Sequence, residues 1–201
     1  DGSVGSFIRL PNGKAVAKSK MSFESDQALG MNRIYERNEE IRDFVDWALD
    51  NDIVAVFEYV APHNRIVLKY EKEEMILLRL RLNSTGEYLD LDDYKDKIGC
   101  IKTPVKCDMT LDEVVESAKT QEGIEGWVVD MGILMKVKTA WYCERHGLLT
   151  DDIYRENRIV ERILADDIDD VLGQIPEDEK EAHERIEKVI AAVSSEMNRR
   201  A

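Results

Sequence analysis

The chain has 201 residues, of which 43% are hydrophobic and 35% are charged, and its formal net charge is −14. This length and composition suit one domain of ordinary size with a small addition, and the negative charge argues against unspecific adhesion to nucleic acid. Three cysteines at irregular spacing (Cys100, Cys107 and Cys143) argue against a disulfide framework, and no apolar run approaches the roughly 20 residues of a membrane span. We therefore expect a cytoplasmic protein without a membrane partner.

Positive charge is concentrated near the start of the chain. Arg9, Lys14, Lys18 and Lys20 stand among the first 20 residues beside a single acid, Asp1. A local basic patch can bind phosphates even in an acidic protein, so the total charge does not exclude an RNA partner.

The first elements predict a hairpin. Residues 1–6 have the composition of a Gly/Ser loop, and residues 7–10 and 15–17 indicate two strands about a Pro-Asn-Gly turn. Lys18 and Lys20 continue the returning strand two residues apart, so we expect their side chains to leave the same face.

A helix and a buried strand are predicted next. Residues 36–50 carry apolar side chains at helical spacing, and residues 53–60 form a strongly β-prone run with Glu58 inside it. A carboxylate in such a strand is costly unless it is paired, bound to a metal or facing a cleft. The alternative is that Glu58 lies on a half-exposed face, which the alternation of a strand also permits.

Hairpin-like spacing continues along the chain. Strands are predicted at residues 66–68, 75–82 and 88–91, so the sheet should be largely antiparallel. Thr110 and Glu113 have the spacing of a capping box and predict a helix that ends near residue 120.

From residue 151 onward only helical spacing appears. Pro176 followed by three acids predicts the start of a further helix. We therefore expect an α+β fold, in which a core of antiparallel sheets (residues 1–146) is followed by a helical C-terminal unit (residues 147–201).

The stretch from Glu125 to Tyr142 predicts a second hairpin. Residues 125–129 and 136–142 read as two strands joined through Asp130-Met131-Gly132. Lys136 and Lys138 should leave the same face of the sheet, and Glu125 begins the other strand. Two cations and one acid held on strands suit a bound phosphate with its metal ion. The alternative is the solvated face of an amphipathic hairpin.

Several other kinds of site are not indicated. Cys100 and Cys107 lack a Cys-x-x-Cys spacing and a neighbouring histidine, which argues against zinc. The histidines are scattered, so no nucleophile–histidine pair can be read from the sequence. Neither a Walker-type loop nor a Gly-x-Gly-x-x-Gly motif occurs, so a nucleotide would be bound by another scheme.

Four short motifs indicate that scheme. In chain order they are Asp1-Gly2-Ser3, Phe57-Glu58-Tyr59-Val60, Glu125-Gly126 and Lys136-Val137-Lys138. Over residues 1–146 the chain resembles the covalent nucleotidyltransferases, which include RNA ligases, DNA ligases and mRNA capping enzymes. More narrowly, it resembles the T-even phage RNA ligase family that repairs cleaved tRNA. The narrower resemblance also rests on residues 18–20, 61–68, 85–88, 124–128 and 139–142.

The resemblance implies an ATP-dependent RNA ligase. A lysine of the enzyme takes AMP from ATP, the AMP passes to the 5′-phosphate of an RNA, and a 3′-hydroxyl displaces AMP to join the strands. The implied cofactors are ATP, bound as AMP, and Mg²⁺ or Mn²⁺. The implied partners are tRNA or other single-stranded RNA ends, with no obligate protein partner, in the host cytoplasm if the protein is phage-encoded.

The resemblance also implies roles for individual residues. Glu58 would contact the ribose of the adenylate, and Glu125 would bind the metal ion. Lys136 and Lys138 would contact the α-phosphate and stabilise its transition state. Tyr142 is a further position carried over from the family.

Four more candidate residues lie near the start of the chain. Gly2 would permit close approach of the backbone, and Asp1 would orient the surroundings of the nucleophile. Lys20 and Lys18 match family lysines near the phosphates. All of these roles are implied by the resemblance rather than by the spacing of the residues.

The family motif Lys-x-Asp-Gly carries the nucleophile two positions before its Asp, and this sequence begins at that Asp. We therefore expect a fragment of a longer ligase that starts just after the nucleophilic lysine. One alternative is a catalytically inert fragment with the ligase fold, which only binds nucleotide or RNA. A DNA ligase or capping enzyme is a further alternative. The helical sequence after the last motif argues against it, because a barrel of short strands should stand there.

Overall fold

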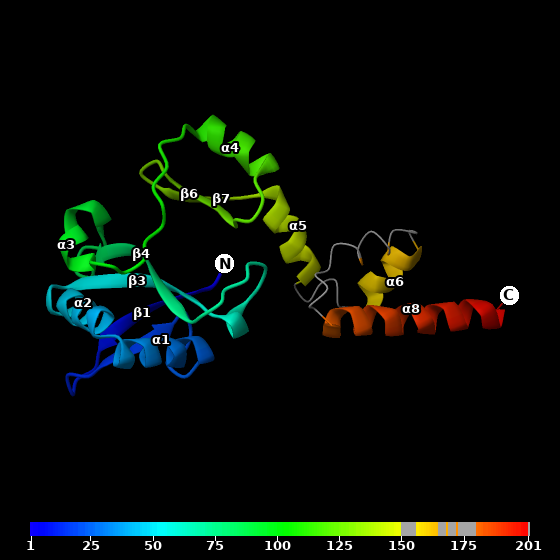
Figure 1. Ribbon diagram of the computed structural model, residues 1–201, viewed down its shortest axis with the longest axis horizontal. Coiled ribbons are helices and arrows are strands. Elements are labelled where there is room, and N and C mark those ends of the chain that lie inside the picture. The colour runs from blue at the N-terminus through cyan, green and yellow to red at the C-terminus, as the bar shows by residue number, and fades with distance from the viewer. Residues whose placement is uncertain (150–155, 165–167, 169–171, 173–179, 201) are drawn as a thin grey trace. The chain divides into compact units, whose positions relative to one another are not determined.

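The computed structural model describes residues 1–149, 156–164, 168, 172 and 180–200 (Figure 1). The chain forms two compact units. The first comprises residues 1–65 and 69–108, and the second comprises residues 66–68 and 109–201.

The first unit is built on a five-stranded sheet with the strand order β2-β1-β3-β4-β5. All neighbouring strands run antiparallel, which confirms the predicted α+β fold with an antiparallel sheet. The strands are β1 (Ser3–Arg9), β2 (Ala15–Ser19), β3 (Ile53–Val60), β4 (Glu74–Leu82) and β5 (Tyr88–Leu89).

Two helices, α1 (Asp26–Arg37) and α2 (Glu39–Asp50), cover one face of this sheet (Figure 1). Their apolar residues form the core of the unit together with alternate residues of the strands, among them Phe57 and Tyr59. The opposite face of the sheet carries the residues between these, including Glu58.

The helix predicted over residues 36–50 is two helices. Asn38 ends α1 and caps α2, because its side-chain oxygen accepts a hydrogen bond from the N–H of Ile41. Most of α1 thus lies before the predicted start, in residues whose sequence did not indicate a helix.

Other segments also differ from the predicted strands. Residues 3–6 belong to β1 rather than to a loop, because they pair with β3, and the missing side chain of Gly5 leaves room for Met31. Residues 66–68 form no strand, and Lys20 follows the end of β2 instead of lying in it. The remaining elements of the unit are short helices: η1 (Pro62–Asn64), η2 (Leu91–Tyr94, part of which was predicted as strand) and α3 (Lys95–Ile98).

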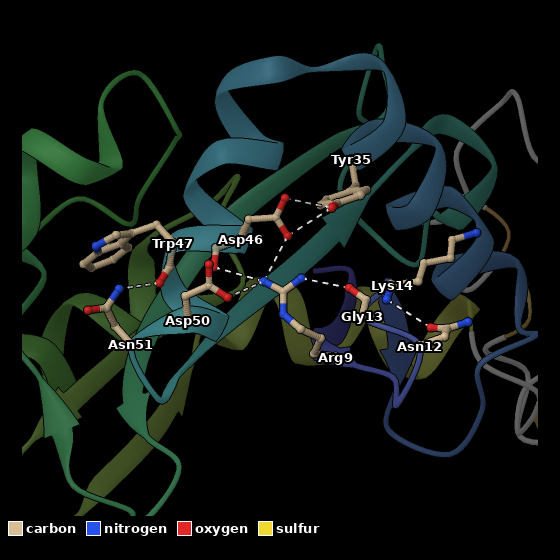
Figure 2. A network of polar contacts seen from close by, with 9 residues as sticks. All are labelled: Arg9, Asn12, Gly13, Lys14, Tyr35, Asp46, Trp47, Asp50 and Asn51. Atoms are coloured by element: carbon tan, nitrogen blue, oxygen red, sulfur yellow. Dashed lines mark hydrogen bonds and ion pairs between the residues drawn. The ribbon is translucent and has the colours of Figure 1, made fainter.

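Arg9 ties the β1–β2 hairpin to α2 (Figure 2). Its guanidinium donates to the carbonyl of Gly13 at 3.0 Å and to the carboxylate of Asp50 at 2.7 Å. Asp46 lies 3.3 Å from the same guanidinium and accepts a hydrogen bond from the Tyr35 hydroxyl at 3.1 Å. Burial raises the pKa of the Tyr35 hydroxyl, which therefore stays protonated as the donor. The network joins β1 to both helices, although each exposed ion pair alone contributes little stability.

A buried tyrosine fixes the packing of α1 against the sheet. The Tyr59 hydroxyl donates to Glu73 at 2.7 Å and lies 3.1 Å from Nε2 of His63, and Arg33 pairs with the same Glu73 oxygen at 2.6 Å. Burial and the hydrogen bond to Glu73 raise the pKa of Tyr59. Its ring is thus held in one position, and Gly30 of α1 leaves room for it, since a Cβ there would lie 2.5 Å from the ring carbon Cζ.

Replacing Gly30 by alanine should lower the free energy of unfolding by about 1–3 kcal/mol, the range typical of overpacking a core. In an open helix the same change would stabilise the protein by roughly 1 kcal/mol, so the sign of the effect tests the contact. Urea denaturation followed by circular dichroism measures it. The control is Leu29→Ala at a neighbouring position that is 44% exposed, and it should change stability less. A stabilised Gly30→Ala variant would contradict this packing.

The first helix of the second unit is α4 (Leu111–Thr120), and the predicted capping box between Thr110 and Glu113 is present. This helix packs on a hairpin of β6 (Gly126–Asp130) and β7 (Leu134–Lys138). The second strand of that hairpin is shorter than predicted. Residues 140–142 instead begin helix α5 (Ala140–Leu149).

The described part of the C-terminal region is helical, as predicted, and contains α6 (Glu156–Leu164) and α8 (Lys180–Arg200). Ile159 and Ile186 are fully buried in a small apolar cluster that the two helices share. Pro176 and the acids after it, predicted to begin a helix, lie outside the described residues. None of the described helices has the length and apolar character required to cross a lipid bilayer.

Candidate active site

Strand pairing in the second unit places the two candidate lysines on one face of the hairpin. Gly126 lies opposite Lys138, and Val128 lies opposite Lys136. Because side chains alternate along a strand, both ammonium groups leave the same face, which confirms the predicted arrangement. The half-buried Val137 belongs to the other face.

Gly126 allows β6 to approach β7 closely just after Glu125. Its φ is +150°, a value that residues with a side chain rarely adopt, and a Cβ there would lie 2.0 Å from the carbonyl oxygen of Val137. The pairing continues one residue beyond the strands, where the N–H of Thr139 donates to the carbonyl of Glu125 at 2.9 Å. Glu125 is thereby fixed beside the end of β7.

One carboxylate pairs with both lysines. Oε1 of Glu125 lies 2.5 Å from Nζ of Lys136 and 3.4 Å from Nζ of Lys138, and the Glu125 side chain is 14% exposed. Burial raises the pKa of Glu125, but the hydrogen bond from Lys136 acts in the opposite direction, and the pKa lies below its ordinary value. The carboxylate is therefore ionised at neutral pH. These three side chains carry one more positive than negative charge, which suits a phosphate.

Tyr142 and Thr139 lie where the hairpin meets α5. Tyr142 is 1% exposed, and the ammonium of Lys138 lies 4.7 Å from the centroid of its ring, within cation–π range. Thr139 is fully buried, and its hydroxyl is hydrogen-bonded to the backbone on both sides. Sequence reasoning missed Thr139, although a threonine directly before a helix is a recognisable N-cap signal.

In the first unit, Glu58, Gly2 and Asp1 lie together where β1 meets β3. A Cβ at Gly2 would lie 2.5 Å from the carbonyl oxygen of Tyr59 and 3.0 Å from Cγ of Glu58, so a glycine is required beside this strand. The Glu58 side chain is 20% exposed and lies 3.3 Å from the main-chain nitrogen of Asp1, which is itself buried. Glu58 is thus partly exposed in the middle of its strand.

Lys18 lies on the same face of the sheet as Glu58. Ser6 of β1 pairs with Lys18 on one side and with Val56 on the other, and Val56 is two residues from Glu58. Residues opposite each other or two apart in a strand share a face, so Lys18 and Glu58 do as well. Lys20 lies just past β2, so strand pairing does not set the direction of its side chain.

Glu125 offers one carboxylate to a divalent cation. Within the part of the chain that the structure describes, no three His, Cys, Asp or Glu side chains are grouped to hold a metal ion. Mg²⁺ is commonly bound by one or two carboxylates together with phosphate oxygens and water. The residues therefore fit a cation that is shared with a phosphate ligand.

Comparison with known proteins decides the family. The T4-type RNA ligase family, described as RNA ligase, matches residues 1–142. The chain belongs to this RNA ligase family. The match includes every candidate residue named above and confirms the resemblance drawn from the motifs.

Relatives of this RNA ligase chain are longer than it is. A protein named as an RNA ligase in Thermovibrio ammonificans is 26% identical over an alignment of 141 positions, which covers 66% of this chain and 37% of that protein. An archaeal ATP-dependent RNA ligase of known structure is 14% identical with a TM-score of 0.50, over 94% of this chain and 55% of that one. An apo mutant of the Naegleria gruberi RNA ligase is also 14% identical, with a TM-score of 0.51 over 72% of this chain and 48% of that one. The chain thus spans between about a third and about half of the length of these relatives. At 14% identity, the two structures support the fold alone.

Proposed function

We propose that this protein is an ATP-dependent RNA ligase. It joins an RNA 3′-hydroxyl to a 5′-phosphate through a Lys-AMP and an RNA-adenylate intermediate. The observation that supports this most is the hairpin on which Glu125 pairs with Lys136 and Lys138 on one face, in a chain of the RNA ligase family. The proposed catalytic core is residues 1–146, to which residues 147–201 add a helical unit.

The two lysines suit the chemistry of all three steps. Each step is an in-line transfer at a phosphorus atom, so catalysis depends on positioning and on neutralising the charge that develops on the phosphate oxygens. We assign the α-phosphate oxygens to Lys136 and Lys138. Their ammonium groups are fixed on a paired strand before the substrate arrives, and such preorganisation makes charges effective in the transition state.

Glu125 is proposed to hold Mg²⁺ or Mn²⁺ together with phosphate oxygens. A divalent cation at this carboxylate supplies further neutralisation of phosphate charge. Glu125 also holds the ammonium of Lys136 at 2.5 Å and so orients it along the hairpin.

The residues of the first unit are proposed to bind the nucleotide. Glu58 is a hydrogen-bond acceptor for the ribose hydroxyls, because its partly exposed carboxylate projects from a central strand. Gly2 lets the nucleotide approach the backbone at the start of β1, and the buried Asp1 orients that segment. Lys18 and Lys20 are assigned to the phosphates. The partner is a single-stranded RNA end, of tRNA or another RNA, and its binding should weaken with salt.

Sealing of a pre-adenylated RNA by the polypeptide of residues 1–201, with Mg²⁺, tests the proposal. In this reaction the 3′-oxygen bonds to phosphorus and AMP leaves, so the reaction does not use the lysine that stands two positions before Asp1 in the family motif. We expect a ligated product, formed at least about 100-fold more slowly by Glu125→Ala. The matched control, Glu122→Ala, removes an exposed carboxylate three residues away and should keep the parent rate.

No ligated product from folded parent protein would contradict the proposal. If that protein still bound RNA or nucleotide, the inert module with the ligase fold would be the better description. Equal rates for Glu125→Ala and the parent would remove Glu125 from the site.

A further inference from the structure

We infer that Thr139 is a positioning residue of the ligase site, which sets the geometry of Glu125, Lys138 and Tyr142 toward one another. The inference rests on the proposed function of those three residues. In this role Thr139 does not contact the substrate.

One side of Thr139 fixes the carboxylate strand. The residue is fully buried, its N–H donates to the carbonyl of Glu125 at 2.9 Å, and its hydroxyl donates to the carbonyl of Ile124 at 2.9 Å. Two successive carbonyls on the approach to β6 are thus bound by one residue at the end of β7. The backbone of Glu125 cannot move along β7 without breaking both hydrogen bonds.

The other side of Thr139 fixes helix α5. Its hydroxyl accepts a hydrogen bond from the N–H of Tyr142 at 3.0 Å, and its carbonyl accepts one from the N–H of Cys143 at 3.0 Å. Thr139 therefore caps α5, and this cap places the ring of Tyr142 under Lys138. The hydroxyl donates to one element and accepts from the other, so its rotation is fixed as well.

The hydrogen bonds of Thr139 also position the side chain of Lys138, the residue before it. Lys138 itself takes no part in these hydrogen bonds. Its ammonium lies between the Glu125 carboxylate at 3.4 Å and the Tyr142 ring at 4.7 Å, and Thr139 fixes the backbone of both partners. A side chain that only capped a helix would not need to bind the opposite strand as well. Because Thr139 binds both, it fixes the two groups that set the direction of the Lys138 ammonium.

Thr139→Val and Thr139→Ser separate this role from that of an ordinary cap. Valine keeps the shape but neither hydrogen bond of the hydroxyl, whereas serine keeps both bonds. We expect Thr139→Val to lower kcat for sealing of pre-adenylated RNA by about 10- to 100-fold, the effect of a small misplacement of a reacting group, with KM for RNA unchanged. Thr139→Ser should recover the parent rate to within about threefold.

The matched control is Thr110→Val. Thr110 is also a threonine N-cap in the same unit, on α4, and its hydroxyl accepts from the N–H of Glu113. Thr110 is exposed, so its loss should lower thermal stability less than Thr139→Val does. It should also leave sealing within about threefold of the parent. Equal slowing by the two valine variants, or no rescue by serine, would overturn the inference.

A second measurement reads the geometry without activity. In the parent protein the ring of Tyr142 should shift the NMR signals of the Lys138 ε-methylene protons upfield. This shift should persist in Thr139→Ser and disappear in Thr139→Val. If the parent does not seal RNA but the shift behaves in this way, the proposed function fails and the positioning role stands. An unchanged shift in Thr139→Val overturns the positioning role.

Discussion

Lys138→Ala is expected to slow the sealing of pre-adenylated RNA by about 100- to 1000-fold, the usual effect of removing one preorganised group at a developing charge. The Lys138 ammonium is held between Glu125 and the ring of Tyr142, so its position does not depend on the substrate. The charge on the phosphate oxygens is greatest in the transition state. The loss should therefore appear in kcat, with little change in KM for RNA, and single-turnover rates at saturating RNA measure it.

The matched control for this variant is Lys119→Ala. Lys119 is an exposed lysine of α4 in the same unit and pairs with Glu116 one turn away on that helix. Its removal subtracts the same charge from the protein without touching the hairpin, so sealing should remain within about threefold of the parent. Similar losses in both variants would show an effect of net charge on RNA binding and would contradict the role proposed for Lys138.

Gly126→Ala is expected to reduce sealing by at least about 100-fold and to destabilise the hairpin. The added Cβ would lie 2.0 Å from the carbonyl oxygen of Val137 and 2.8 Å from the Cα of Lys138. Both are backbone atoms that cannot rotate aside, and a misplacement of about 1 Å is enough to cost roughly 100-fold in rate. Sealing assays together with thermal unfolding of the variant measure the two effects.

Gly123→Ala is the control that isolates the clash. Gly123 also has a positive φ, +77°, but a Cβ there would have nothing within 4 Å. Alanine at this position meets backbone strain of about 1–3 kcal/mol without displacing β7, so the folded variant should seal RNA within about threefold of the parent. If Gly126→Ala and Gly123→Ala had equal effects, the close approach of the two strands would not matter for the site.

The parts of the fold that local chemistry determines were predictable from the sequence. Residues 53–60 form β3, because β-branched and aromatic residues favour a half-buried extended strand. The capping box at Thr110 begins α4, because its side-chain hydrogen bonds involve only neighbouring residues. The shared face of Lys136 and Lys138 follows in the same way from the period of a strand.

The segments that sequence reasoning missed depend on distant contacts. Gly5 suggested a loop, but it lies in β1, where it pairs with β2 and β3 and leaves room for Met31. Gly30 lowers the helix propensity of residues 26–37, yet α1 forms because Ala28 and Met31 are buried against the sheet. Both glycines make room for a neighbour that is distant in sequence, and no local pattern reveals such a neighbour.

In the candidate site, too, some features follow from the local sequence and others depend on contacts that the sequence does not reveal. The sequence indicated that Glu125 and two lysines share a hairpin, and the geometry agrees, while their catalytic roles stay predictions. It could not show that Tyr142 lies in a helix, because the change from strand to helix is made by the buried hydroxyl of Thr139. It also could not place Lys20 outside β2, because a strand ends where its neighbour stops pairing.

The ion pairs of Glu125 imply thermodynamic linkage between two ligands. An ammonium 2.5 Å from the carboxylate repels an approaching divalent cation and competes for the same oxygen. A phosphate bound to both ammonium groups would offset their positive charge and so raise the affinity of the hairpin for the cation. By reciprocity, the cation raises the affinity for phosphate by the same factor, so the two ligands should bind cooperatively.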